Sequence, residues 1–337
     1  MREPATLAAA LAAGAIGATA AQQAGLPAPL IVGPSVFVAL AGLAGLRFTF
    51  PDWLRDAAFV ALGLVIGAGV TPQALAAARQ WPASFALLAV AVWAIMKASS
   101  AALTRRQAFS RRGSLLAAAP GHLSYVLALS AASNEDVPRI AIVQSIRLLA
   151  LTLLVPLGVS LATGAPPSQP VPAEMPVLSL AALGAGGVIA GLLLRRAGAP
   201  APMLLGAMAI ATLACAPGYM AGAVPSSLSV PALVLLGVLI GSRFSGVTVA
   251  QLRDCAMAGL AATAVATILS AVFAIIAAFA TGLPLSLMLV CFAPGGLETM
   301  TAIALMTGAD PAVVAAHHVF RMFLLTFLLP AMMTAQR

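Results

Sequence analysis

Only 8% of the 337 residues are charged and 62% are hydrophobic, which excludes an ordinary water-soluble protein, because a soluble domain has about a quarter of its residues charged. The mean hydropathy of +1.06 predicts instead an all-α polytopic membrane protein. The formal net charge of +8 does not indicate a nucleic-acid partner, since no segment is polar enough to fold as a soluble basic module.

Apolar segments follow one another along the chain, six before and six after a proline-rich stretch. In the first half they lie near residues 4–24, 28–46, 57–71, 82–103, 114–133 and 138–161. In the second half they lie near residues 177–194, 201–218, 230–243, 255–281, 284–306 and 311–334. A membrane-spanning helix needs about 20 residues, so the third segment of each half is short for a straight crossing.

The two halves of the chain resemble each other in sequence. The stretch GLPAPLIVG (residues 25–33) matches GAPAPMLLG (residues 198–206) at five of nine positions, and residues 119–156 align without a gap on residues 293–330. These matches predict a tandem duplication. Residues 1–162 form the first membrane repeat, residues 163–176 a proline-rich linker, and residues 177–337 the second membrane repeat. We interpret the paired GLPAPLIVG and GAPAPMLLG stretches as determinants of the fold.

The distribution of arginine predicts that the second repeat is inverted in the membrane relative to the first. The loop at residues 104–113 carries four Arg and is expected in the cytoplasm. The linker at residues 163–176 carries neither Lys nor Arg and is expected on the other side of the membrane. Each repeat then has about five transmembrane helices plus one re-entrant or broken helix. Both termini are cytoplasmic in this scheme, and Arg79 is its exception.

Pro-Gly pairs interrupt the fifth apolar segment of each half, at Pro120-Gly121 and Pro294-Gly295. Inverted repeats with interrupted helices are the architecture of many secondary transporters, whose binding sites lie near the membrane midplane. The helix that restarts after each Gly directs its free N–H groups and positive dipole end into a cavity, which suits an anion. The alternative is that both pairs are ordinary proline kinks in spanning helices.

Arg147 and Arg321 occupy equivalent positions in the last segment of each half. An arginine at the centre of a membrane helix costs at least about 2.5 kcal/mol, so it is usually paired or faces a cavity. One interpretation is that both bind a substrate carboxylate, which a guanidinium holds with two hydrogen bonds. The other is a structural lock through ion pairs, with Glu135 or Asp136 for Arg147 and with Glu298 or Asp310 for Arg321.

Glu298 follows the second break, and its counterpart in the first half is Ser124. A single carboxylate in an otherwise symmetric site is what coupling to H⁺ or Na⁺ requires, although it also suits the start of a helix or an arginine partner. His122 directly follows the first break and is a second candidate for handling a proton. His317 and His318, one turn before Arg321, are either proton relays or packing residues.

The substrate-binding residues predicted from these patterns are Gly121, His122, Ser124, Arg147, Gly295, Gly296, Thr299 and Arg321. The predicted ion-coupling residues are Glu298 and His122. For Ser124 and Thr299, whose hydroxyl groups lie near the breaks, hydrogen bonding between helices is the alternative. The sequence predicts no catalytic residues, no metal site and no cofactor.

The paired GLPAPLIVGP and GAPAPMLLGAM stretches, together with APGHLSYVLALS and APGGLETMTAIAL, resemble the bacterial AbrB-duplication membrane family over essentially the whole chain. Members of that family often carry the labels ammonia monooxygenase or AbrB-type regulator. By analogy, the expected layout looks like that of elevator-type transporters with inverted repeats, which include the bile-acid symporter and cation/proton antiporter relatives. A monooxygenase needs clustered His, Cys or carboxylate ligands for copper or iron, and the three histidines do not form such a cluster.

The sequence therefore favours a secondary transporter in the inner membrane of a bacterium, and the analogy with the transporters named above implies the elevator type. The expected substrate is a small organic anion or a zwitterion with a carboxylate, moved by coupling to H⁺ or Na⁺. The alternatives are a channel or facilitator for a small neutral solute such as ammonia, and a membrane-embedded sensor or regulator. We expect an assembly as a homodimer in the lipid bilayer and no enzymatic activity.

Overall fold

The computed structural model describes residues 3–69, 81–105, 109–163 and 173–334, and within these ranges the chain folds into α-helices with one short 3-10 helix and no β-strand. The prediction of an all-α fold is confirmed. Most of the linker at residues 163–176 lies outside the described residues, as do Arg2, Arg79 and Arg337.

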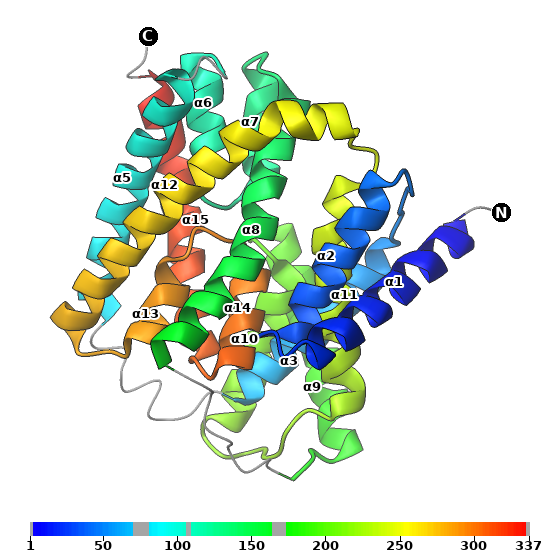
Figure 1. The fold of residues 1–337 in the computed structure, drawn as a ribbon. Coiled ribbons are helices and arrows are strands. Elements are labelled where there is room, and N and C mark those ends of the chain that lie inside the picture. The colour runs from blue at the N-terminus through cyan, green and yellow to red at the C-terminus, as the bar shows by residue number, and fades with distance from the viewer. Residues whose placement is uncertain (1–2, 70–80, 106–108, 164–172, 335–337) are drawn as a thin grey trace.

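One lobe of the described structure contains six helices, three from each half of the chain (Figure 1). They are α1 (Glu3–Gln23), α2 (Pro29–Leu43), α3 (Asp52–Ala68), α9 (Val177–Arg196), α10 (Pro202–Cys215) and α11 (Ser226–Gly241), and α11 continues into the 3-10 helix η2 (Ser242–Phe244). Within this unit, the most extensive packing between the halves joins α3 to α10 and α2 to α11. We call this unit the six-helix lobe.

The remaining described helices form a second unit, which we call the eight-helix lobe. They are α5 (Trp81–Arg105), α6 (Arg111–Ala118), α7 (Leu123–Ala132), α8 (Val137–Thr163), α12 (Val249–Thr281), α13 (Leu285–Phe292), α14 (Leu297–Thr307) and α15 (Pro311–Thr334). The long helix α12 packs on both α5 and α8, so the two halves of the chain also share the core of this lobe.

Local sequence signals set the ends of several helices. Pro29 and Pro202 occupy the first turns of α2 and α10, where a missing N–H group costs nothing. Thr248 and Gln251 form a capping box at the start of α12. Gly282 and Gly308 end α12 and α14 in the left-handed conformation that glycine adopts without strain.

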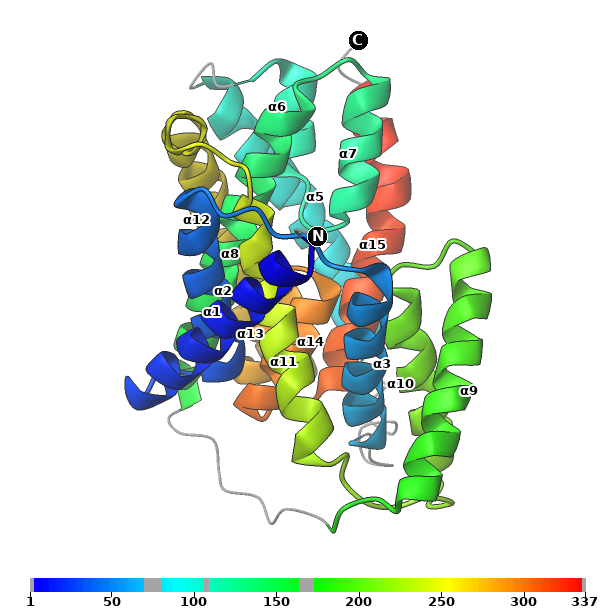
Figure 2. The same cartoon turned by 90° about the vertical axis from the view of Figure 1, so that its right-hand side faces the viewer.

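The two helices on either side of each Pro-Gly pair lie at the same end of the eight-helix lobe. Figures 1 and 2 both place α6 and α7 at the end of this lobe that carries the C-terminus, and α13 and α14 toward its opposite end. Each pair is therefore a re-entrant hairpin and not a kinked spanning helix. Entry from opposite ends is the relation that inverted repeats require, while an inverted relation over the whole of each half stays a prediction.

Six described helices are long and apolar enough to cross a membrane by length and composition, namely α5, α8, α9, α11 with η2, α12 and α15. Helices α2 and α10, with 15 and 14 residues, are shorter than the predicted segments at residues 28–46 and 201–218. They end early because the chain turns at Gly45 and Gly218, both with positive φ. At 1.5 Å per residue each is about 22 Å long, less than a typical hydrocarbon core. The protein is a membrane protein, and the total of ten crossings stays a prediction.

Glycines bring the first two helices of each half into backbone contact. A Cβ atom on Gly33 of α2 would lie 2.0 Å from the carbonyl oxygen of Gly17 in α1, and one on Gly206 of α10 would lie 2.3 Å from the backbone nitrogen of Gly191 in α9. Gly33 and Gly206 end the two matching stretches that the sequence marks as fold determinants. Close approach through small residues is a usual way to pack helices in a membrane.

We predict that Gly33→Ala destabilises the protein by about 1–3 kcal/mol, because the added methyl group forces α1 and α2 apart. The measurement is the thermal unfolding midpoint of the purified protein. Gly184→Ala in α9 is the matched control, since a Cβ there meets no atom within 4 Å. Equal midpoints for the two variants would contradict this account of the packing.

Candidate functional site

The two hairpin tips meet inside the eight-helix lobe. The first break separates Ala118 at the end of α6 from Leu123 at the start of α7, and the second separates Phe292 from Leu297. Gly121 has φ +90°, and a Cβ atom on it would lie 3.4 Å from the carbonyl oxygen of Gly295 in the other break. The two breaks therefore lie against each other.

Arg147 of α8 binds the carbonyl groups that the first break leaves free. Its guanidinium donates to the carbonyl oxygens of Ala118 at 3.3 Å and Ala119 at 2.7 Å, and to the side-chain oxygen of Gln144. Gln144 in turn donates from Nε2 to the carbonyl of Leu116 at 3.0 Å. The last carbonyls of a helix have no partner within it, so these two side chains complete the hydrogen bonding of α6.

Arg321 of α15 has the same role at the second break. It donates from Nη1 to the carbonyl oxygen of Ala293 at 2.6 Å and from Nη2 to that of Gly295. The residue is 1% exposed. The same guanidinium lies against the first break, because a Cβ atom on Gly121 would be 3.2 Å from Nη2. Arg321 therefore stands between the two tips.

The carboxylates considered as partners of these arginines have other roles. Asp136 and Asp310 accept hydrogen bonds from backbone N–H groups in the first turns of α8 and α15, so both are helix caps. Glu135 accepts from the hydroxyl of Ser110. In the described part of the chain no ion pair joins Arg147 or Arg321 to a carboxylate. The predicted ion pairs are therefore absent from the described residues, and the acceptors of both guanidinium groups there are backbone carbonyls and the side-chain oxygen of Gln144.

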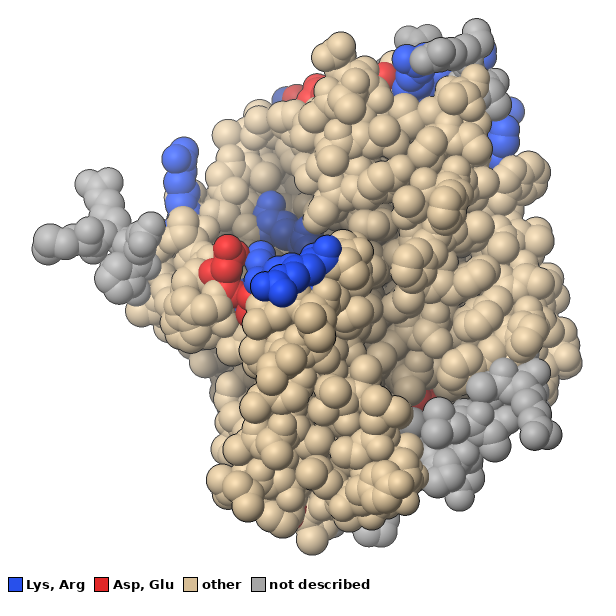
Figure 3. All heavy atoms as spheres, turned by 180° about the vertical axis from the view of Figure 1, so that it is seen from behind, with Lys and Arg blue, Asp and Glu red and all other residues tan. Residues whose placement is uncertain are grey.

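A cavity of about 320 Å³ lies between the two lobes, next to the hairpin tips. We call it the central cavity. The eight-helix lobe contributes Gly121, His122, Leu123, Ser124, Gln144, Arg147, Leu148, Pro294, Gly295, Gly296, Leu297, Glu298 and Met322. The six-helix lobe contributes Gly198, Ala199, Pro200, Ala201 and Arg243. Figure 3 shows Lys and Arg side chains within and around a hollow on one face of the molecule.

The first turns of three helices line this cavity. The segments that precede α7, α14 and α10 all belong to its wall, and no side chain caps any of the three helices. The first N–H groups of a helix have no partner within the helix, and its dipole places partial positive charge there. The geometry therefore favours a negatively charged ligand.

Arg243 is a cavity residue that is absent from the predicted substrate-binding set. It lies in η2 and is exposed, with its side chain on the wall of the central cavity. The neighbouring Ser245 fixes this segment, since its hydroxyl accepts a hydrogen bond from the N–H group of Phe48 at 2.9 Å. A comparison of the two halves could have revealed Arg243, because the equivalent residue in the first half is the uncharged Gly69.

Glu298 is half-buried at the start of α14 and borders two cavities. The second, a side cavity of about 230 Å³, is also lined by Thr299, Arg243 and Arg55. Within the described residues no ion pair includes Glu298. The structure thus brings Glu298 and Arg243 to the boundary between the cavities, and it places Thr299 in the side cavity only.

The three histidines have different surroundings. His122 lines the central cavity in a left-handed conformation, with its ring 5.2 Å from that of Tyr125. His317 is fully buried and hydrogen-bonds through Nε2 to Ser84 at 2.8 Å. His318 is also fully buried, and its Nδ1 binds the carbonyl of Val314 at 3.0 Å. The packing interpretation fits His317 and His318, whereas His122 lies where a proton could reach it.

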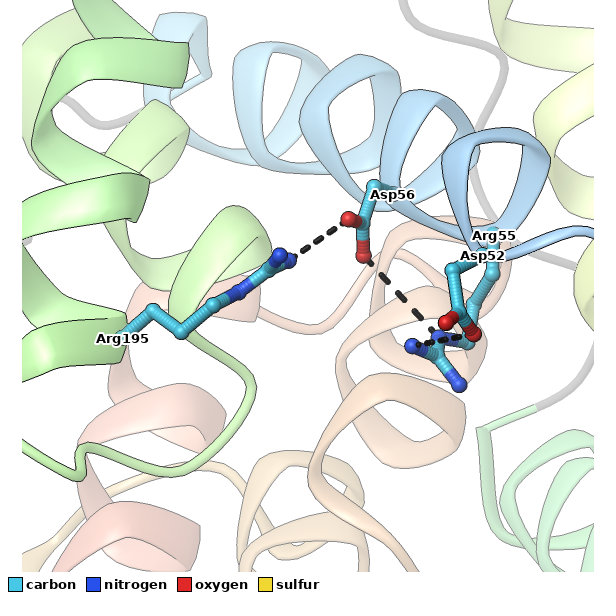
Figure 4. Close-up of polar contacts among 4 residues, drawn as sticks. All are labelled: Asp52, Arg55, Asp56 and Arg195. Carbon is cyan, nitrogen blue, oxygen red and sulfur yellow. Dashed lines mark hydrogen bonds and ion pairs between the residues drawn. The ribbon is translucent and has the colours of Figure 1, made fainter.

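An ion-pair cluster joins α3 to α9 within the six-helix lobe (Figure 4). Arg195 donates to Asp56 at 2.6 Å, and Arg55 lies 3.1 Å from Asp52 and 3.9 Å from Asp56. Arg55 also borders the side cavity. The cluster therefore connects the far wall of that cavity to α9.

The seven predicted substrate-binding residues other than Arg321 all lie on the wall of one of these two cavities. Arg321 lies between the tips and does not belong to the wall described for either cavity. Binding of substrate or ions by the wall residues stays a prediction.

Fold and site together define a polytopic α-helical membrane protein with two re-entrant hairpins beside a cavity between two lobes. A family described as "Transition state regulatory protein AbrB" matches residues 1–79 and 30–336, so the chain belongs to the AbrB family. The resemblance seen in the repeated motifs is thereby confirmed. No curated protein and no solved structure matches the chain.

We predict that Gly121→Ala lowers the thermal midpoint by several degrees, because the new methyl group displaces the guanidinium of Arg321. Gly45→Ala is the control. Gly45 has a similar φ of +101°, but a Cβ there meets nothing within 4 Å. Both variants carry the backbone strain of a positive φ, about 1–3 kcal/mol. The account requires Gly121→Ala to be the less stable of the two, and the reverse order would refute the contact.

Proposed function

We propose that the protein is a secondary transporter of a small organic anion, or of a zwitterion with a carboxylate, coupled to H⁺ or Na⁺. The observation that carries this proposal is the central cavity, which places two arginines and three uncapped helix starts around one space between two lobes. Irregular backbone at membrane depth is tolerated where it is buried or lines an aqueous cavity, and binding sites of transporters use such breaks.

The charges of the wall support an anionic ligand. Arg147 and Arg243 oppose the single carboxylate of Glu298, so the charged side chains of the described wall sum to a positive value. The guanidinium of Arg147 already donates to backbone carbonyls. Arg243 is exposed and lies on the cavity wall. Arg243 is therefore the residue that we expect to bind the carboxylate of the substrate directly.

The arrangement of the lobes supports movement of the elevator type. Figure 2 shows the eight-helix lobe projecting beyond the six-helix lobe at the end with α6 and α7, and the six-helix lobe projecting at the other end. The cavity wall is divided between the lobes. A displacement of one lobe along the other would carry a ligand held at the hairpin tips across the membrane.

The position of the basic residues supports a bacterial inner membrane with cytoplasmic termini. Arg105, Arg111 and Arg112 lie at the end of α5 and the start of α6, which is the end of the molecule that carries the C-terminus. Cytoplasmic loops carry an excess of Arg and Lys. Assembly as a homodimer is part of this proposal as an expectation.

We predict that a screen of carboxylates and amino acids finds a ligand that raises the thermal midpoint of the purified protein, since binding to the folded state stabilises it by mass action. Arg243→Gln should abolish this ligand-induced rise. The control is Arg253→Gln, which removes an exposed arginine near the start of α12. If Arg243→Gln keeps the full rise, the anion is bound elsewhere; if no carboxylate stabilises the protein, the proposal fails.

Glu298→Gln separates coupled transport from other functions in proteoliposomes loaded with the stabilising ligand. A transporter that couples through Glu298 should lose accumulation driven by an ion gradient in this variant. A channel for a neutral solute such as ammonia would tolerate the change. A sensor or regulator, as the family description suggests, would bind the ligand and show no flux at all.

A further inference from the structure

We infer that Arg147 and Arg321 are built-in cations that fill the carbonyl sites of the two broken helices, so that neither break binds Na⁺. For transport the inference rests on the proposed function: it deepens that function by making the coupling ion a proton. The chemical basis is that a guanidinium and a Na⁺ ion seek the same backbone oxygens at an interrupted helix.

A helix that ends inside a membrane protein leaves its last carbonyl groups without partners. In transporters with interrupted helices, such carbonyls and the C-terminal ends of the half-helices coordinate the coupling cation. Any cation that the protein supplies itself would therefore occupy the place of a dissolved one.

At the first break this place is filled from α8. Arg147 is 4% exposed and donates to the carbonyls of Ala118 and Ala119, while Gln144 donates to that of Leu116. Apart from the hydrogen bond from Arg147 to Gln144, these side chains donate to backbone carbonyls at the C-terminal end of α6 and in the residue that follows it. A Na⁺ ion could reach these oxygens only by displacing a guanidinium that is covalently part of the protein.

At the second break the same arrangement recurs with a different neighbour. Arg321 donates to the carbonyls of Ala293 and Gly295, and no carboxylate of the described residues forms an ion pair with it. Its Nε atom is buried without a hydrogen-bond partner. A buried charge is stable only when it is compensated, and here the carbonyl dipoles supply the compensation. The second break is therefore a cation site by construction, and Arg321 occupies it.

Besides Glu298 and Thr299, which border the cavities described above, a third cavity near the breaks offers oxygen ligands in the described structure. A small cavity of about 80 Å³ is bordered by Thr267, Ser270, Ala293 and Pro294, and the hydroxyls of Thr267 and Ser270 are buried without partners. Because the carbonyl of Ala293 already accepts from Arg321, two hydroxyl groups remain, which is fewer oxygens than a dehydrated cation needs. We expect water there. The experiment must nevertheless detect Na⁺ at this position.

The first measurement is the thermal midpoint of the unmodified protein in NaCl, KCl and choline chloride at equal ionic strength. The inference predicts the same midpoint in all three salts. A higher midpoint in NaCl would overturn it, and loss of that effect in Thr267→Val would locate the ion in the small cavity. This comparison needs no variant that risks misfolding.

The second measurement is chemical rescue. Arg321→Ala should lower the midpoint by several degrees, and millimolar guanidinium chloride should restore part of the loss while choline chloride does not. Arg253→Ala, which removes an exposed arginine, is the control and should not respond. The midpoint of Arg321→Lys should fall less than that of Arg321→Ala. Guanidinium should not raise the midpoint of Arg321→Lys, since the lysine ammonium group fills the site. If Arg321→Ala folds and guanidinium does not raise its thermal midpoint, the inference is contradicted.

Flux measurements keep this inference distinguishable from the proposed function. Ligand flux in proteoliposomes that follows a pH gradient and ignores a Na⁺ gradient supports both. Flux that requires Na⁺ overturns the built-in cation and leaves the transporter standing. If there is no flux, but the midpoint is independent of Na⁺ and guanidinium rescues Arg321→Ala, the proposed function fails and the assignment of the two arginines survives.

Discussion

The architecture depends on one constraint, which is that the carbonyl groups at a broken helix end inside an apolar lobe must find donors. Each unsatisfied polar group in such surroundings costs several kcal/mol. Arg147 with Gln144 meets this need at the first break, and Arg321 meets it at the second. Because both arginines reach the breaks from the following spanning helix, they fix where each hairpin tip stops. The starts of α7 and α14 then face the central cavity.

The two halves share residues that build the scaffold of this protein, and they differ in some of the charges that line the central cavity. The residues that recur in both halves do structural work: Arg147 and Arg321 bind carbonyls, and Asp136 and Asp310 cap helices. Two charged residues that differ between the halves lie on the wall of the central cavity. Arg243 stands where the first half has Gly69, and Glu298 stands where it has Ser124. Charged residues that are present in only one half make the two sides of the cavity wall different, and such a wall can orient a bound ligand.

The helices could be read from the sequence because their signals are local. Apolar runs, the Pro-Gly pairs and the matching glycine-rich stretches predicted the segments to within a few residues, and the breaks fell where expected. The division into lobes could not be read, because each lobe takes helices from both halves and each half is split between lobes. Which neighbours a membrane helix chooses depends on packing between surfaces far apart in the chain.

The site was predictable only where residue type marks it in the sequence. Charged side chains at membrane depth identified Arg147, Arg321 and Glu298, but the partners of the two arginines are backbone carbonyls, which no residue type marks in a sequence. Arg243 follows a short apolar segment and reads as a loop residue until α11 and η2 are seen to end beside the cavity. Comparing the two halves position by position would have shown it as an added charge.

The proposed transporter requires the lobes to move past each other around the central cavity when the ligand crosses the membrane. The most direct test joins the lobes across the cavity, with Ser124→Cys and Ala199→Cys in a protein that lacks Cys215, Cys255 and Cys291, using a cleavable bifunctional thiol reagent. Single-cysteine variants that carry the same reagent are the control, because in them the reagent can block the cavity but cannot join the lobes. The account predicts that bridged protein loses ligand flux beyond either single variant and regains it on cleavage. Full flux while the lobes are bridged would contradict it.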